Sequence, residues 1–200
     1  MAEYQTFYVS KVKIVYRLEL VESKKPVDLR LKYYTSFIQD KDIKENIIKA
    51  IEFQGDRQNH KTNVKAQMTD WRMQDQKGFK ELDNIIIPML EKISETQYSL
   101  NDIQYRCSDM WGMKYSSEDI AIYHDHFPAT WSIAYYINPP ENSPGLIFTD
   151  YNEEVKLKDG LIVIFPGTTI HSVPKKKFKG NRYVVSANYH VVRSYGSFNN

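Results

Sequence analysis

The sequence predicts a mainly β domain with flanking helices, and three observations lead to this fold class. Two helical patterns lie in the first half of the chain, at residues 40–53 and 77–97. From residue 103 onward the sequence changes to short β-type runs separated by turn signals. No helical pattern recurs between these runs. The strands should therefore pair antiparallel, as a sandwich or open barrel with helices packed on one side.

The chain begins with a predicted strand region. Residues 7–20 combine rough apolar alternation with many β-branched residues, which indicates one or two strands. In residues 40–53, isoleucines recur at helical spacing after the candidate cap Asp40, so a short helix is expected there. Residues 1–102 as a whole should supply N-terminal strands and supporting helices.

The longer helix is expected around residues 77–97, where apolar residues recur at intervals of three and four. Pro88 lies inside this pattern. It should kink the helix or split it in two, because proline lacks the N–H that a helix interior requires. The polar residues 54–76 between the two helices are interpreted as a mobile connecting loop.

The β-rich core is expected over residues 103–192. Its strand-like runs are residues 103–111, 120–126, 131–137, 145–150, 154–160, 161–165, 168–174 and 182–192. A chain of 200 residues with 42% hydrophobic content can bury one sizeable core. A single domain is therefore expected over residues 1–200.

Composition excludes several classes of protein and site. Cys107 is the only cysteine, so no internal disulfide can form, and any metal must be bound by histidine and carboxylate. A net charge of +2, from 27 Lys+Arg and 25 Asp+Glu, is too balanced to predict a nucleic-acid partner. No stretch approaches the roughly 20 apolar residues of a membrane span, and the N-terminus lacks the apolar block of a secretory signal. We therefore expect a cytoplasmic protein with no membrane partner.

Three histidines stand out in the core region. His124 and His126 flank Asp125, and residues at i and i+2 of a β-strand point to the same face while the residue between them points to the other. His171 follows a buried-looking strand and a Pro-Gly turn. A single strand histidine is usually a hydrogen-bonded core residue, but a pair with a third histidine downstream favours a metal site. Imidazole suits Fe(II), whose remaining coordination positions would be left for small molecules.

The last strand-like run carries polar side chains on one face. Arg182, Ser186 and Asn188 share a parity, whereas Val185 and Ala187 share the other. A guanidinium in a partly buried cleft is the natural partner of a carboxylate, and a serine hydroxyl can complete the grip. The histidines, the arginine and the serine together indicate a metal with an organic acid beside it.

The order of these features is specific, although each one taken alone is not. The features are His124-Asp125-His126, residues 132–138 (SIAYYIN), residues 143–150 (SPGLIFTD), residues 161–173 (LIVIFPGTTIHSV) and residues 182–186 (RYVVS). This order resembles the Fe(II)- and 2-oxoglutarate-dependent oxygenases, and within them the prolyl-hydroxylase-like branch, which includes oxygenases encoded by bacteriophages. The resemblance covers about residues 105–192. It implies a double-stranded β-helix core of the jelly-roll or cupin-like kind over residues 103–192.

The resemblance also implies roles for individual residues. His124 and His171 would bind the metal. Arg182 and Ser186 would hold the distal carboxylate of 2-oxoglutarate, and Tyr136 would reach the same cosubstrate from the neighbouring strand. Residues 111–115 (WGMKY) look like the family's W-x-x-x-Y approach to the site. By this less specific resemblance, Tyr115 would also contact the cosubstrate.

Position 126 departs from the family, which has a carboxylate where this chain has His126. Two alternatives remain. His126 itself binds, which gives a three-histidine site, or Asp125 turns inward because the strand is bulged. Strand parity favours His126, so the expected metal set is His124, His126 and His171.

The function that the resemblance implies is hydroxylation of an unactivated C–H bond with Fe(II), 2-oxoglutarate and dioxygen. The acceptor would be a protein or peptide, hydroxylated at a residue such as proline, and no catalytic residue beyond the metal ligands is expected. Two alternatives stay open. One is a non-catalytic β-helix module that binds metal and 2-oxoglutarate for sensing or structure. The other is a three-histidine dioxygenase of the cupin type that does not use 2-oxoglutarate and is indifferent to Arg182.

Overall fold

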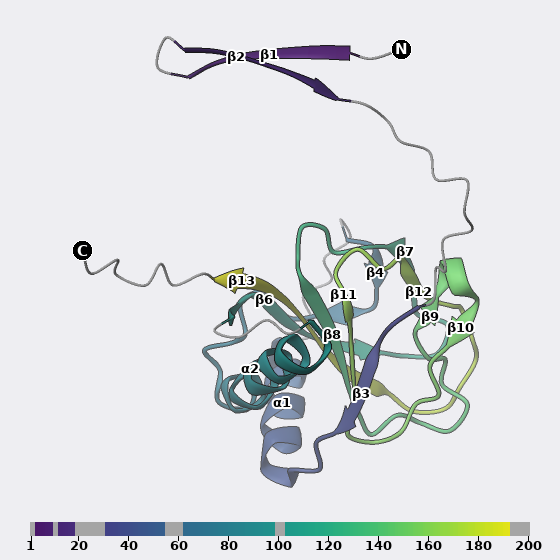
Figure 1. Cartoon of the computed structure of the whole chain (residues 1–200). Coiled ribbons are helices and arrows are strands. Elements are labelled where there is room, and N and C mark those ends of the chain that lie inside the picture. The colour runs from purple at the N-terminus through teal and green to yellow at the C-terminus, as the bar shows by residue number, and fades with distance from the viewer. Residues whose placement is uncertain (1–2, 10–11, 19–30, 55–61, 99–102, 193–200) are drawn as a thin grey trace. The chain divides into compact units, whose positions relative to one another are not determined.

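The computed structural model describes most of the chain as two compact units, shown in Figure 1. The described residues are 3–9, 12–18, 31–54, 62–98 and 103–192. In the first unit, strands β1 (Glu3–Val9) and β2 (Val12–Leu18) form an antiparallel hairpin, which confirms the strands expected there. The remaining elements belong to the second unit, residues 32–200. The single domain expected over residues 1–200 stays a prediction.

The second unit is built on two antiparallel sheets. A six-stranded sheet has the order β3-β11-β8-β13-β6-β5, and a five-stranded sheet has the order β10-β9-β12-β7-β4. The six-stranded sheet contains β3 (Tyr34–Phe37), β5 (Gln67–Met68), β6 (Gln104–Tyr115), β8 (Trp131–Ile137), β11 (Leu161–Pro166) and β13 (Arg182–Val192). The five-stranded sheet contains β4 (Val64–Lys65), β7 (Ile120–His124), β9 (Ile147–Phe148), β10 (Glu153–Glu154) and β12 (His171–Val173), and a 3-10 turn, η1 (Thr149–Tyr151), follows β9. Most of the strands expected from residue 103 onward are thus confirmed. The run expected over residues 154–160 is wrong, because only Glu154 of it lies in a strand, and the run expected over residues 145–150 is reduced to β9 followed by η1.

Two helices lie beside each other against the six-stranded sheet (Figure 1). Helix α1 (Lys41–Gln54) begins at the expected cap, since the backbone N–H of Ile43 donates to Oδ1 of Asp40 over 3.0 Å. Helix α2 (Lys77–Tyr98) is continuous through Pro88, so the expected split is wrong. Asn84, whose carbonyl loses its helical donor at Pro88, and Pro88 itself are both exposed, so water can satisfy that carbonyl.

The main apolar core lies between these helices and the outer face of the six-stranded sheet. Val185, Ala187 and Tyr189 of β13 are fully buried in it. The helices contribute Ile43, Ile47, Ile51, Phe79, Leu82, Ile86 and Leu90 to the same cluster. Gly112 of β6 allows α1 to approach, because a Cβ there would overlap the side chain of Ile51. The opposite face of the sheet is left for other side chains.

Part of the expected loop at residues 54–76 forms strands instead, which corrects the sequence prediction. Strand β4 pairs with β7 of the smaller sheet, and β5 pairs with β6 of the larger sheet. Each strand has only two residues, which is too short for a hydrophobic period to appear in the sequence. Residues 55–61 lie outside the described residues. Within the described ranges, no helix has the length and apolar character needed to cross a bilayer.

Candidate functional site

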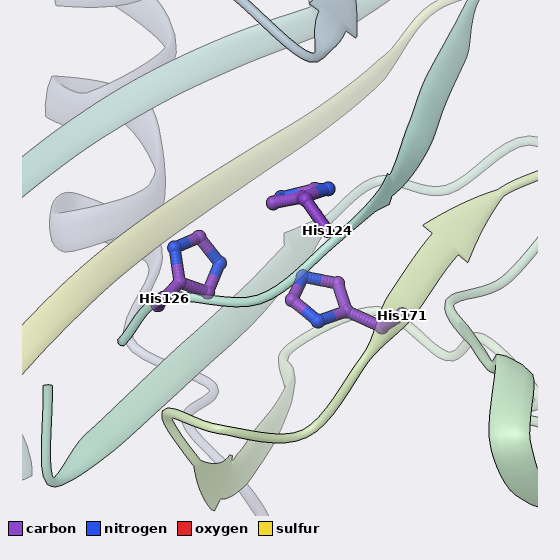
Figure 2. Close-up of side chains that lie close together, drawn as sticks. All are labelled: His124, His126 and His171. Atoms are coloured by element: carbon purple, nitrogen blue, oxygen red, sulfur yellow. The ribbon is translucent and has the colours of Figure 1, made fainter. Parts of the chain in front are cut away.

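Three imidazoles converge between the two sheets, as Figure 2 shows. The candidate ligand atoms of His124, His126 and His171 all lie within 4.8 Å of one another. The ring centroids are 5.0 Å apart for His124 and His126, 4.5 Å for His124 and His171, and 5.0 Å for His126 and His171. The structure thus brings together the three residues that the sequence placed in one metal set, and their role as ligands stays a prediction.

The backbone explains how these rings meet. His171 begins β12 and pairs in register with His124, the last residue of β7. His126 lies just beyond the end of β7, and its N–H donates to the carbonyl of Gly167 over 2.7 Å. This contact with the turn after β11 holds His126 toward the other two rings, so the expectation that both histidines of the pair lie within a strand is wrong.

Asp125 does not belong to the cluster of candidate ligands. Its side chain is exposed, and its Oδ1 accepts a hydrogen bond from the backbone N–H of Phe127 over 3.2 Å. The β7–β12 ladder does contain an irregularity, but it falls between the pairs Val173↔Ala121 and His171↔His124, before Asp125. The geometry therefore favours His126 over Asp125 as the third side chain of the cluster.

Two of the rings are held in one tautomer by backbone carbonyls. Nδ1 of His124 lies 2.6 Å from the carbonyl oxygen of Ile122, and Nδ1 of His171 lies 2.9 Å from that of Thr169. A carbonyl oxygen can only accept, so each Nδ1 carries the hydrogen. Each Nε2 then presents a lone pair, the arrangement in which histidine binds metals.

Burial keeps two of the three imidazoles uncharged. Desolvation, followed by repulsion from His124, lowers the pKa of His126 to about 4. Desolvation, followed by repulsion from His126 and His124, lowers the pKa of His171 to about 3. Both imidazoles are therefore neutral near pH 7, as a metal ligand must be.

An inner cavity lies between the two sheets, and all three histidines line it. Arg182 lines the same cavity and is only 1% exposed. Its Nη1 donates to the carbonyl of Pro144, and its guanidinium carbon lies 4.2 Å from the ring centroid of Tyr115. The Nε of Arg182 has no hydrogen-bond partner, and no carboxylate pairs with Arg182 among the described residues. A buried cation in this state is ready to receive an anionic ligand.

The other predicted cosubstrate residues line the same cavity. Tyr136 of β8 pairs with Val184 of β13, and Ser186 of β13 pairs with Ala134 of β8. Burial raises the pKa of Tyr115 to about 12, although Arg182 acts in the opposite direction. Burial likewise raises the pKa of Tyr136. Both phenols therefore stay protonated and able to donate.

An outer cleft adjoins the inner cavity. The two share Val64, Trp111, His124 and His126 as lining residues. Sequence reasoning named Asp125 as an alternative metal ligand and placed Asn188 on the polar face of its strand. It gave no role to the other lining residues, which are Thr62, Asn63, Trp71, Asp109, Phe127, Pro128, Ala129 and His190. Strand parity counted back from Tyr115 would have found Trp111 and Asp109, because every second residue of β6 faces inward. No local pattern could have found Trp71, whose place depends on contacts made far along the chain.

These residues fit a divalent metal and a small dicarboxylic acid. The metal would be bound by three neutral imidazoles, and the orphaned Nε of Arg182 matches a carboxylate. The tyrosines and Ser186 add neutral donors along the same wall. The donor set is compatible with Fe(II) beside an organic acid.

Comparison with known proteins relies on structure, since no family model and no curated protein matches the sequence. A viral collagen prolyl hydroxylase from Paramecium bursaria Chlorella virus-1, in its 2OG complex, superposes with a TM-score of 0.57 at 15% identity, covering 82% of this chain and 98% of that chain. A Pseudomonas putida prolyl-4-hydroxylase gives a TM-score of 0.62 at 12% identity, covering 82% and 94%. A Trichoplax adhaerens prolyl hydroxylase, in complex with a peptide fragment of hypoxia-inducible factor, gives 0.57 at 15% identity, covering 78% and 82%.

These similarities extend over most of this chain and of each neighbour. Because the sequence identities are low, the similarities bear on the fold alone. The expected fold class is confirmed. The chain has the double-stranded β-helix fold of the prolyl hydroxylases among the 2-oxoglutarate- and Fe(II)-dependent oxygenases.

Proposed function

We propose that the protein is an Fe(II)- and 2-oxoglutarate-dependent dioxygenase that hydroxylates an unactivated C–H bond. The observation that carries this proposal is the pairing, in one cavity, of three clustered imidazoles with a buried guanidinium that lacks a counter-charge. The Nε of Arg182 is buried without a hydrogen-bond partner, which is costly unless a ligand pairs with it. A metal and a dicarboxylate together account for the clustered imidazoles and the buried guanidinium.

In this proposal each side chain has a separate task. His124, His126 and His171 hold Fe(II). Arg182 and Ser186 grip the distal carboxylate of 2-oxoglutarate. When bound, the metal supplies the oxidising chemistry, in which 2-oxoglutarate and dioxygen give succinate and carbon dioxide while one oxygen atom enters the C–H bond.

The two tyrosines and the aromatic wall orient and shield this cosubstrate. Tyr136 donates toward it from β8, and the ring of Tyr115 holds the guanidinium of Arg182 in place. Phe165 packs against His171, with ring centroids 4.9 Å apart, and Trp111 packs against His126, with centroids 5.9 Å apart. These contacts exclude water from the metal ligands and fix their rings.

Three neutral ligands leave the metal with its full positive charge, whereas a carboxylate ligand would remove part of it. We therefore expect an anionic cosubstrate to be held tightly. The acceptor is proposed to be a protein or peptide, hydroxylated at a residue such as proline, because the structural neighbours are prolyl hydroxylases and one of them holds a peptide. A cytoplasmic location, in a host cell if the chain is phage-encoded, belongs to the same proposal.

The test is succinate formation from 2-oxoglutarate, with Fe(II) and dioxygen, in the absence of an acceptor. The wild-type protein should form succinate slowly and steadily, and His171→Ala should abolish it because the metal is lost. Asp42→Asn, an exposed change on α1, serves as the control for substitution itself.

The same assay separates the alternatives. Binding of 2-oxoglutarate without succinate formation would identify the non-catalytic module. Oxygen consumption that does not require 2-oxoglutarate and survives loss of Arg182 would identify the three-histidine dioxygenase of the cupin type. Either result would overturn the proposed reaction.

A further inference from the structure

The outer cleft is lined by two carboxylates and, among the described residues, by no lysine or arginine. The carboxylates belong to Asp109 and Asp125. The chain as a whole contains slightly more Lys+Arg than Asp+Glu, 27 against 25. An opening lined by carboxylates therefore departs from the average surface of this protein and favours a cationic ligand.

Each of these carboxylates keeps an oxygen for a ligand. Oδ2 of Asp109 accepts from the hydroxyl of Ser108 over 2.8 Å, and Oδ1 of Asp125 accepts from the N–H of Phe127. Within the described part of the chain, neither Asp109 nor Asp125 forms an ion pair. The hydrogen bonds orient both carboxylates without neutralising them.

Aromatic rings complete the lining of the cleft. Trp71 is 40% exposed and packs against Trp111, with ring centroids 4.7 Å apart, and Phe127 is 73% exposed. The face of an exposed indole attracts an ammonium or guanidinium group. In the outer cleft the indole of Trp71 lines the same space as the carboxylates of Asp109 and Asp125. Trp111 is only 3% exposed, and its Nε1 has no hydrogen-bond partner among the described residues.

The outer cleft lies next to the proposed reaction centre, since His124 and His126 line both the outer cleft and the inner cavity. A group bound in it would therefore sit beside the residue that reacts. Resting on the proposed function, we infer that the acceptor is a polypeptide segment that places a lysine or arginine side chain in the outer cleft, next to the hydroxylated residue. The same carboxylates repel phosphates, which disfavours a nucleic-acid acceptor.

The test uses three fluorescein-labelled peptides, Gly-Ala-Pro-X-Ala-Gly, in which X is lysine, glutamine or glutamate. The full chain is loaded with Mn(II) and 2-oxoglutarate, so that peptide binding is measured by fluorescence anisotropy without turnover. We expect the lysine peptide to bind roughly tenfold more tightly than the glutamate peptide, with the glutamine peptide between them. The preference should shrink as salt is raised.

Variants locate the effect. Asp109→Asn and Asp125→Asn should each weaken binding of the lysine peptide about two- to fivefold and leave the glutamine peptide unchanged. Asn keeps an oxygen for the hydrogen bond from Ser108 or Phe127, so each variant removes charge and little else. Asp42→Asn makes the same chemical change at an exposed position of α1, a helix that packs on the other face of the larger sheet. This variant should have no effect on peptide binding.

The outcomes are distinguishable from failure of the proposed function. Equal affinities for the three peptides, a preference for glutamate, no binding of the lysine peptide, or unchanged affinity in both Asn variants would each overturn the inference. Calorimetry on the same samples measures 2-oxoglutarate binding. If 2-oxoglutarate binds while the lysine preference is absent, only the inference fails; if 2-oxoglutarate does not bind, the proposed function fails, and the inference that rests on it fails as well.

Discussion

Arg182→Met tests the proposed cosubstrate site most directly, because it removes the buried charge and keeps an apolar side chain of similar length. In the protein without ligands, Arg182 retains one charge-assisted hydrogen bond, to Pro144, and one cation–π contact, with Tyr115. Together these contribute about 3 to 5 kcal/mol. Desolvating the guanidinium costs several kcal/mol, which is similar in size. We therefore expect the substitution to change the free energy of unfolding of the ligand-free protein by less than about 2 kcal/mol.

The effect on 2-oxoglutarate should be large. Removing one partner of a buried, hydrogen-bonded charge pair costs about 2 to 5 kcal/mol, or roughly 30- to 5,000-fold in affinity. At a 2-oxoglutarate concentration of about 100 times its Kd, the wild-type protein gains about 2.7 kcal/mol of stability, whereas the variant gains less than about 1 kcal/mol. For a chain of this size the wild-type gain corresponds to a rise in Tm of about 5 to 11 °C.

The assay is thermal unfolding with Mn(II), with and without 2-oxoglutarate, for the wild type, Arg182→Met and Arg182→Lys. Lysine keeps the charge but not the planar fork, so it should restore only part of the shift. The shift produced by Mn(II) alone should be nearly the same in all three proteins. A full 2-oxoglutarate shift in Arg182→Met would refute the assignment of Arg182.

Two further predictions concern the metal set and the stability of the fold. His126→Ala should lose bound iron and Asp125→Ala should retain it, as measured by elemental analysis of the folded variants. His124→Ala is the control, because it should lose iron whichever residue is the third ligand. Loss of iron in Asp125→Ala and its retention in His126→Ala would make Asp125 the ligand. Glu52→Gln should destabilise the protein by less than about 1 kcal/mol at pH 7, because a hydrogen bond from Tyr183, followed by one from Lys114, lowers the pKa of Glu52. A lowered pKa means that this contribution is present above the ordinary pKa of glutamate and is lost as pH falls through the folded value. Urea unfolding at several pH values should show the two proteins converging as the pH falls below the ordinary pKa of glutamate, and a difference that grows at acid pH would contradict the sign.

Local patterns were sufficient for most elements of the fold. The cap Asp40, the stripe of α2 and the apolar alternation of β13 each depend on neighbours within a few residues, and each led to the observed element. The two-residue strands β4 and β5 and the strand β3 were not predicted, because their pairing partners, rather than their own composition, hold them in place.

The candidate site shows the same limit. Strand parity and the resemblance predicted that Arg182, Ser186 and Tyr136 share one site; the structure brings them to one cavity, and their roles stay predictions. His126 joined the cluster for a different reason, namely the hydrogen bond between its backbone and Gly167, which no period in the sequence reveals. The outer cleft was missed altogether, since Trp71 and Asp109 meet there only after β5 has paired with β6.

The alternation along β13 has a consequence for how this protein can change in evolution. Val185, Ala187 and Tyr189 pack under the helices, while Arg182, Ser186 and Asn188 face the cavities. Substitutions on the cavity face can therefore alter ligand preference while the apolar core is preserved. A one-residue insertion or deletion within this strand would instead exchange the two faces and remove core and site together. The acceptor preference should thus drift among relatives by point substitution, whereas the length of this strand should stay constant.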